Sequence, residues 1–191
     1  MSLSVRSFPE LRSRLTAMGR RVRVVVCRPA DAHTLQAVLE SVRLGFVHAL
    51  LVGEYDADTL AAAPPEVRAE VECVPAADAA EAMQRAVQLV HDGEGDVLMK
   101  GLVNSDDLLR HILNKIYGLR PAGAVITHAS AVSLPGFDRL VVLSDVAVIP
   151  YPTLEQRAAQ LDYTIALSRT LGTACPRVAL LHCTEKVSEA F

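Results

Sequence analysis

The sequence predicts an α/β protein with three layers, in which helices cover both faces of a mainly parallel sheet. Short apolar runs alternate along the chain with segments of helical periodicity, the pattern of consecutive strand–helix–strand units. Apolar residues make up 51 % of the 191 residues, enough to bury a substantial core. Aromatic residues make up only 4 %, and the abundant Ala, Val and Leu suit helices packed on a buried sheet.

In the first half of the chain, capping and turn residues mark the limits of the expected helices and strands. Asp31 is placed to cap a helix whose apolar residues recur every three to four positions, and Gly45 ends that helix. Pro64-Pro65 interrupts an Ala-rich segment between two strands. The expected elements are a helix over 8–18, strands over 21–27 and 47–52, a helix over 32–44 between them, a strand over 71–74, a helix over 77–91 and a strand over 96–99.

The segment 97–110 carries the strongest functional signal. Its apolar run stops at Lys100, and a helical pattern begins almost at once. This pattern predicts a helix through Ile116, with Gly118 as its stop. Ligands of α/β proteins usually bind at the carboxyl ends of the strands, and amides and cations at a helix start favour an anion such as phosphate or a carboxylate. The alternative is a capped helix beside a surface lysine. In that interpretation Asp106 and Asp107 complement the helix dipole, and Arg110 pairs with one of them.

The pattern changes after Gly123. Two extended runs, 125–134 and 140–149, flank the turn sequence Pro135-Gly136-Phe137-Asp138 and predict a β-hairpin or two adjacent strands. Polar groups in a core strand must be paired, so those within these runs form either a hydrogen-bonded lattice or the wall of a ligand site. They are Thr127, His128, Ser130, Ser133, Ser144 and Asp145.

Pro150-Tyr151-Pro152 predicts a junction between a first domain, residues 1–149, and a second domain that starts at residue 150. Thr153-Leu154-Glu155-Gln156 fits a capping box that opens a helix to about Leu171, and the run 177–183 predicts a strand. One helix and one strand are too few to bury each other, because such strands usually lie in a sheet covered on both faces. The second domain, 150–191, is therefore expected to be incomplete.

Composition and charge argue against several kinds of function. The net charge is −3 with no long basic run and no Trp, so neither a nucleic-acid surface nor base stacking is expected. No secretory signal and no apolar run long enough for a membrane span are visible, which favours a cytoplasmic protein without a membrane partner. The four cysteines have no CxxC spacing and the six histidines are scattered, so we expect reduced, buried thiols and no metal site. The four are Cys27, Cys73, Cys175 and Cys183.

Three common signatures are missing from the chain. No strand is followed by GxGxxG, and neither a P-loop nor a GxSxG elbow is present. A dinucleotide fold, a P-loop nucleotide site and a conventional nucleophile triad therefore have no support.

Several short motifs are distributed along the chain. They are Asp31 to Val38, Leu98 to Asn104, Leu109-Arg110, Leu113-Asn114-Lys115, Gly118-Leu119-Arg120, Thr127-His128-Ala129-Ser130, Pro135 to Leu140, Ser144 to Val148 and Pro176 to Ala179. These motifs resemble those of the phosphate acetyl/butyryltransferase family, and most of all those of its phosphate butyryltransferase branch. The resemblance extends over nearly the whole chain, and the motifs follow one another in the family's order.

The resemblance implies a two-domain α/β/α enzyme of isocitrate-dehydrogenase-like architecture, usually a homodimer. Such an enzyme transfers an acyl group, butyryl or acetyl, reversibly between coenzyme A and inorganic phosphate. Coenzyme A would be a substrate and no cofactor would be covalently bound. The partners would be an acyl-CoA or acyl phosphate together with inorganic phosphate. The first domain would lack the carboxyl-terminal return that completes it in other members.

The resemblance also implies roles for nine residues. Lys100 and Arg110 would contact an anion beside the backbone at Gly101, and Asn104 and Ser105 would donate hydrogen bonds at the helix start. Asp145 would orient a partner or mark the cleft wall, and the other residues that line the cleft would be Thr127, His128 and Ser130. The family's principal catalytic Ser, Arg and Asp lie beyond the position that matches Phe191, so no catalytic residue is assigned.

Two other hypotheses stay open. A non-catalytic or truncated member of the family would use this fold for dimerisation or metabolite binding. A related phosphate-dependent acyltransferase of lipid synthesis would share the fold more than the motifs, and the run from Leu98 to Asn104 favours the phosphate acyltransferase over it.

Overall fold

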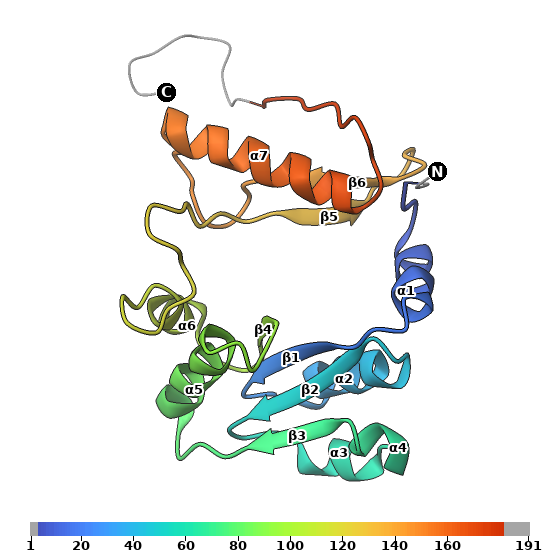
Figure 1. Ribbon diagram of the computed structural model, residues 1–191, viewed down its shortest axis with the longest axis vertical. Coiled ribbons are helices and arrows are strands. Elements are labelled where there is room, and N and C mark those ends of the chain that lie inside the picture. Colours follow the sequence, from blue (N-terminus) through green and yellow to red (C-terminus); the bar gives the residue numbers. More distant parts are fainter. Residues whose placement is uncertain (1–3, 182–191) are drawn as a thin grey trace. The chain divides into compact units, whose positions relative to one another are not determined.

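A computed structural model describes residues 4–181 (Figure 1), which divide into two compact units. The parallel-sheet unit comprises residues 14–121, and the hairpin unit joins residues 4–13 to residues 122–181. The division falls within helix α1 (Phe8–Ala17), so the two units share this helix.

The parallel-sheet unit alternates strands and helices as the sequence predicts. Asp31 caps α2 by accepting a hydrogen bond from the Thr34 amide, and Asp78 caps α5 in the same way. Its elements after α1 are β1 (Val22–Cys27), α2 (Ala32–Arg43), β2 (Val47–Val52), α3 (Ala57–Ala62), α4 (Pro65–Arg68), β3 (Val71–Val74), α5 (Ala79–His91), β4 (Val97–Lys100) and α6 (Ser105–Ile112).

The four strands of this unit form one parallel sheet in the order β3-β2-β1-β4. Successive strands run outward from β1 to β3, and the chain then returns to place β4 on the other side of β1. The strand order therefore reverses between β1 and β4. At the carboxyl edge of this pair, Cys27 of β1 lies opposite Lys100 of β4.

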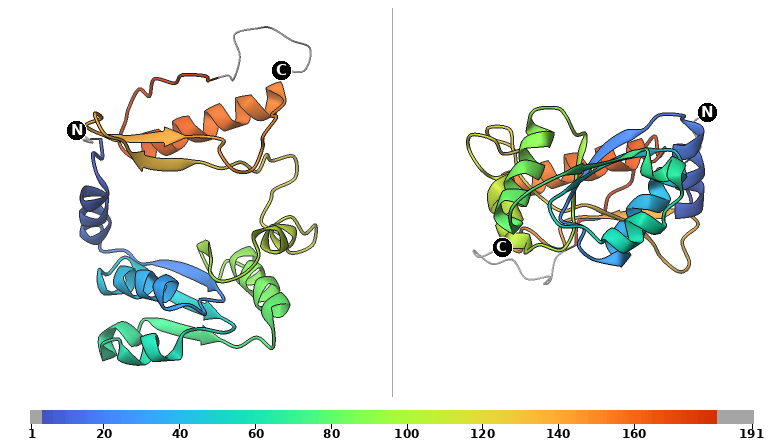
Figure 2. Two further views of the ribbon diagram at one scale, coloured as in Figure 1. Left: turned by 180° about the vertical axis from the view of Figure 1, so that it is seen from behind. Right: turned by 90° about the horizontal axis from the view of Figure 1, so that it is seen from below.

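Helices cover both faces of this sheet (Figures 1 and 2). Val25 and Cys27 of β1 pack in the cluster that contains buried residues of α5 and α6, whereas Val26 packs in the cluster that contains α2 and Val67 of α4. Neighbouring residues of a strand point to opposite faces, so the continuous apolar run of β1 supplies both cores. The predicted α/β class, with three layers and a mainly parallel sheet, is confirmed.

The hairpin unit contains the antiparallel strands β5 (Ser130–Ser133) and β6 (Leu140–Leu143) and the helix α7 (Leu154–Thr170). The predicted capping box is present, since the Thr153 and Gln156 side chains each bond the other's backbone amide. Val5, Leu140 and Leu171 are buried together, and the Val5 amide donates to the Leu171 carbonyl at 2.8 Å. This packing groups β5 and β6 with α7, whereas the sequence predicted a domain boundary at 149/150, after the two strands.

Other predicted elements end earlier than expected. The helix predicted through Ile116 ends at Ile112, because the Asn114 side chain accepts hydrogen bonds from the amides of Ile116 and Tyr117 and turns the chain. The strands predicted over 125–134 and 140–149 are confined to β5 and β6.

The strand predicted over 177–183 is absent from residues 177–181, and residues 182 and 183 lie outside the described part. A strand exists only where a neighbour accepts its ladder of hydrogen bonds, and no described strand pairs with this segment. Within residues 4–181, no helix has both the length and the apolar character needed to cross a membrane.

Candidate functional site

The turn between β4 and α6 lies against the end of β1. The Gly101 amide donates to the Cys27 carbonyl at 2.9 Å, and the Leu102 amide donates to the Arg28 carbonyl at 2.8 Å. A Cβ atom on Gly101 would lie 2.5 Å from the Arg28 carbonyl oxygen and 2.6 Å from that of Cys27. Both are backbone atoms, so only glycine fits where the turn meets the strand end.

Asn104 is the N-cap of α6. Its Oδ1 accepts hydrogen bonds from the amides of Asp106 at 2.8 Å and Asp107 at 3.3 Å. Ser105, the first residue of the helix, is exposed. The cap therefore engages two amides at the helix start that could otherwise bind an anion. It leaves the Asn104 Nδ2 and the Ser105 hydroxyl as side-chain donors there.

The two predicted cations of the turn differ in their partners. Lys100 is exposed, with its Nζ 3.4 Å from the Gly101 carbonyl oxygen, and it forms no ion pair among the described residues. Arg110 pairs with Asp107 one turn earlier in α6, and its side chain is 76 % exposed. Such an exposed pair contributes little to stability, so an incoming anion can displace it at small cost.

Arg28 lies at the carboxyl end of β1, beside the β4–α6 turn, and was not predicted from the sequence as a site residue. It follows β1 directly, has φ of +52°, and donates through Nη1 to the Leu102 carbonyl at 3.1 Å. Its Nε donates to Glu54, which follows β2, at 3.1 Å, and Nη2 donates to the same carboxylate. A residue before a proline favours extended backbone, so the left-handed conformation had no signal in the sequence. The position of Arg28 after the central strand was the available clue.

The thiol of Cys27 beneath this edge is buried, and its burial raises its pKa to about 11. A thiol in this state is protonated and unreactive near neutral pH. The prediction that the cysteines are buried is wrong for Cys73 and Cys175, which are exposed, and Cys183 lies outside the described residues. Cys73 lies on β3, which is at the edge of the sheet and, among the described strands, pairs with β2 alone.

In the hairpin unit, Asp145 organises the predicted polar residues. Its Oδ2 accepts from the Thr127 hydroxyl at 2.6 Å, the His128 amide at 3.1 Å and the Ile149 amide at 3.2 Å. Its Oδ1 accepts at 2.8 Å from each of the amides of Ala147 and Val148. These bonds draw the chain after β6 into a tight loop, which explains why that strand ends early.

The Asp145 carboxylate is held ionised. Partial burial opposes ionisation, but the Thr127 hydroxyl and the surrounding amides outweigh it and keep the pKa of Asp145 well below its usual range. His128 Nε2 lies 3.2 Å from the Ser130 hydroxyl. Thr127, His128, Ser130 and Asp145 therefore form a hydrogen-bonded lattice.

Two buried polar atoms beside this lattice have no hydrogen-bond partner in the described structure, His128 Nδ1 and Ser144 Oγ. Buried polar atoms are nearly always paired in folded proteins. Because these two atoms have no partner among the described residues, each can still form a hydrogen bond with one.

The nine predicted residues thus form two local groups. Lys100, Gly101, Asn104, Ser105 and Arg110 gather at the β4–α6 turn of the parallel-sheet unit. Thr127, His128, Ser130 and Asp145 gather in the hairpin unit. Among residues 4–181, no three His, Cys, Asp or Glu side chains are grouped so that they could hold a metal ion.

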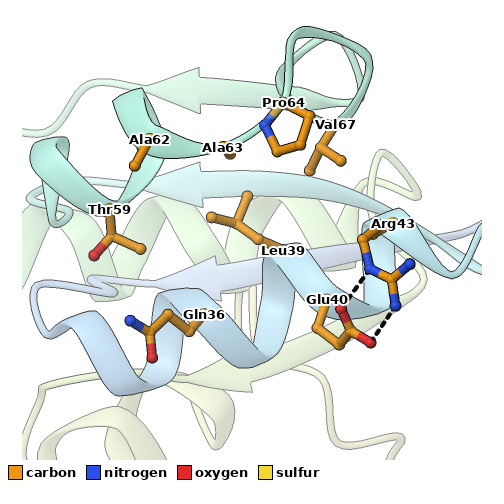
Figure 3. Close-up of a pocket in the computed structure, with 9 residues that line it drawn as sticks. All are labelled: Gln36, Leu39, Glu40, Arg43, Thr59, Ala62, Ala63, Pro64 and Val67. Atoms are coloured by element: carbon orange, nitrogen blue, oxygen red, sulfur yellow. Dashed lines mark hydrogen bonds and ion pairs between the residues drawn. The ribbon is translucent and has the colours of Figure 1, made fainter.

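A separate hollow of about 310 Å³ opens in the parallel-sheet unit, between α2 and the pair α3–α4 (Figure 3). Its wall is mostly apolar, and the Glu40–Arg43 ion pair lies at its edge. None of the nine predicted residues contributes to it. The lining residues are Gln36, Leu39, Glu40, Arg43, Thr59, Ala62, Ala63, Pro64 and Val67.

Comparison with known proteins gives consistent matches. The chain is 31 % identical over 187 residues to the phosphate butyryltransferase of Clostridium acetobutylicum. The aligned region covers 96 % of this chain and 61 % of that protein. It is 30 % identical over 176 residues to the phosphate acetyltransferase of Thermotoga maritima. In this case the aligned region covers 90 % of this chain and 58 % of that protein. The chain therefore spans about 60 % of the length of these relatives.

The fold also matches a solved structure, a branched-chain phosphotransacylase from Enterococcus faecalis V583. The TM-score is 0.70 at 22 % identity, over 87 % of this chain and 58 % of the other. The family described as "Phosphate acetyl/butaryl transferase" matches residues 74–190, a range that includes the β4–α6 turn and the Asp145 lattice. The chain belongs to this phosphate acetyl/butyryl transferase family.

Proposed function

We propose that this chain serves the reversible transfer of an acyl group, butyryl or acetyl, between coenzyme A and inorganic phosphate. The observation that carries the proposal is the position of the β4–α6 turn. It lies inside the family match, at the carboxyl edge where the strand order reverses, and it presents an exposed Lys100 without an ion-pair partner among the described residues. A phosphate group, free or carried by coenzyme A, is the ligand that this chemistry favours.

In the direction of acyl-CoA formation, the coenzyme A thiolate attacks the carbonyl carbon of an acyl phosphate. A C–S bond forms, the C–O bond to phosphate breaks, and phosphate leaves with the bonding electron pair. The reaction needs cations or donors for the phosphate and donors for the oxyanion that develops on the carbonyl oxygen. The transfer involves no gain or loss of electrons. From the family resemblance, we propose that coenzyme A acts as a substrate and that no cofactor is covalently bound.

We assign the phosphate to the turn. Lys100 neutralises its charge, and Asn104 Nδ2 and the Ser105 hydroxyl donate hydrogen bonds to it. Arg110 exchanges its exposed partner Asp107 for the ligand. These residues bind and orient the substrate, and we assign none of them a proton-transfer step.

We assign the hairpin-unit group to a substrate-facing wall. The ionised Asp145 fixes Thr127 and the backbone of His128, while His128 Nδ1 and Ser144 Oγ keep capacity for a ligand atom. Asp145 therefore acts by positioning its neighbours, because its own oxygens already accept five hydrogen bonds. We further propose a cytoplasmic homodimer.

A non-catalytic module that binds coenzyme A is the second candidate. The Asn104 cap and the Arg110–Asp107 pair satisfy much of the turn without a ligand, which favours a role in structure or binding over turnover. Both candidates predict binding of coenzyme A, and only the first predicts reaction.

Thiol release from butyryl-CoA and from acetyl-CoA, with and without inorganic phosphate, separates the two. We expect release that depends on phosphate and falls at least tenfold in Lys100→Ala, since one lost charged contact is worth roughly 1.5–3 kcal/mol. Release without phosphate dependence would contradict acyl transfer to phosphate. Binding of coenzyme A without any release would contradict acyl transfer by this chain and support the module instead. Sedimentation equilibrium tests the dimer.

A further inference from the structure

Arg28 lies at the point of the sheet where the strand order reverses. It follows Cys27, whose partner on the neighbouring strand is Lys100, the last residue of β4. The Arg28 carbonyl accepts the Leu102 amide, so the backbones after β1 and β4 are joined directly. Its side chain is 30 % exposed and therefore reaches the surface of this edge.

The Arg28 guanidinium joins three chain segments. One side of it binds the Glu54 carboxylate after β2 through Nε and Nη2, and Nη1 donates to the Leu102 carbonyl in the β4–α6 turn. A guanidinium holds its N–H groups in a rigid plane, so it fixes the distance between its partners in a way that a lysine cannot. The β4–α6 turn is thus tied to the loop after β2 as well as to β1.

The backbone of Arg28 has an unusual conformation. Its φ of +52° lies in the left-handed region, where an L-residue with a side chain is strained and glycine is not. Strained residues of this kind gather at binding sites, where the surrounding contacts hold them. Here the strain and the bridging guanidinium belong to the same residue.

We propose that Arg28 is a positioning residue that holds the β4–α6 turn in the conformation that binds the phosphate-bearing substrate. It acts through Glu54 and the Leu102 carbonyl. For the identity of the ligand, the inference rests on the proposed function. Arg28 follows β1, whereas the turn follows β4, and the role of Arg28 does not require contact with the ligand.

The test compares Arg28→Ala with the wild type by amide hydrogen exchange without ligand and by calorimetric titration of coenzyme A. We expect the Gly101 and Leu102 amides to exchange about tenfold faster and the affinity to fall about five- to tenfold, because the turn loses a charge-assisted hydrogen bond. Arg28→Gly relieves the left-handed strain. We expect the urea unfolding midpoint of Arg28→Gly to be no lower than that of the wild type. We expect its affinity for coenzyme A to fall as much as that of Arg28→Ala.

Arg23→Ala is the matched control. Arg23 lies on β1 as well and forms a two-point ion pair with Asp96 beside β4, at the opposite edge of the same two strands. We expect it to change neither the exchange of the turn nor the affinity for coenzyme A.

Three results would test the positioning role of Arg28. Unchanged exchange and affinity in Arg28→Ala would overturn the proposal. Lower affinity with unchanged exchange would also overturn it and make Arg28 a direct ligand contact. Faster exchange in a protein whose wild type binds no coenzyme A would support the positioning role and contradict the proposed function.

Discussion

Replacement of Asp145 by Asn removes the charge at the centre of the hairpin-unit lattice. The carboxylate accepts two hydrogen bonds on Oδ1 and three on Oδ2. An amide offers one acceptor oxygen, so two or three donors lose their acceptor whichever way it turns. A hydrogen bond to a charged group contributes roughly 1.5–3 kcal/mol, and Asp145 is partly exposed. We therefore expect Asp145→Asn to lower the free energy of unfolding by about 3 kcal/mol at pH 7.

The pH dependence of this effect has a definite sign. The pKa of Asp145 is lowered in the folded protein, so its stabilisation is complete above the unfolded pKa of about 3.9 and is lost as the pH falls toward the folded value. We expect the difference in unfolding free energy between wild type and variant to be constant from pH 7 to pH 5. Below about pH 4 it should shrink.

Urea titrations followed by circular dichroism at pH 7, 5 and 3 measure this difference. Asp162→Asn is the matched control, because Asp162 is exposed on α7, and its effect should stay within about 0.5 kcal/mol. An Asp145→Asn variant as stable as this control at pH 7 would refute the reasoning. A difference that stays undiminished at pH 3 would refute it as well.

Three further predictions concern the β4–α6 turn and the strand end beneath it. Gly101→Ala should cost about 2 kcal/mol or more in urea unfolding, because its Cβ would meet the Arg28 carbonyl at 2.5 Å, and an unchanged midpoint would contradict this. Asn104→Ala should cost about 1 kcal/mol and speed amide exchange in α6, whereas Asn104→Asp should retain the cap. Cys27, with its pKa raised to about 11, should react with a thiol reagent at pH 8 at least about tenfold more slowly than Cys73, as measured by mass spectrometry of labelled peptides. Equal rates would count against the burial of Cys27.

Much of the parallel-sheet unit could be predicted because its signals are local. The runs 47–52 and 71–74 are bounded by turn residues, and β2 and β3 have these same limits. The Asp31 cap and the periodic apolar face of α2 are likewise readable from neighbouring residues. Local chemistry and burial agree in these elements, so the sequence is sufficient to predict them.

What could not be predicted depends on residues far apart in the chain. Asp145 accepts a hydrogen bond from the Thr127 hydroxyl, eighteen positions away, and Arg28 donates one to the Leu102 carbonyl, 74 positions away. Neither pairing leaves a periodic pattern in the sequence. The absence of the expected strand from residues 177–181 has a related reason, since an apolar run becomes a strand only beside a partner.

The role of the β4–α6 turn as a phosphate site is tested most directly by calorimetric titration of coenzyme A into the wild type and Lys100→Ala. Lys115→Ala is the control, because Lys115 is an exposed lysine of the same unit beyond α6. We predict that the wild type binds and that Lys100→Ala weakens the affinity about tenfold, which corresponds to about 1.4 kcal/mol, while Lys115→Ala leaves it unchanged. Equal affinities for all three proteins, or a wild type that binds no coenzyme A, would contradict the assignment.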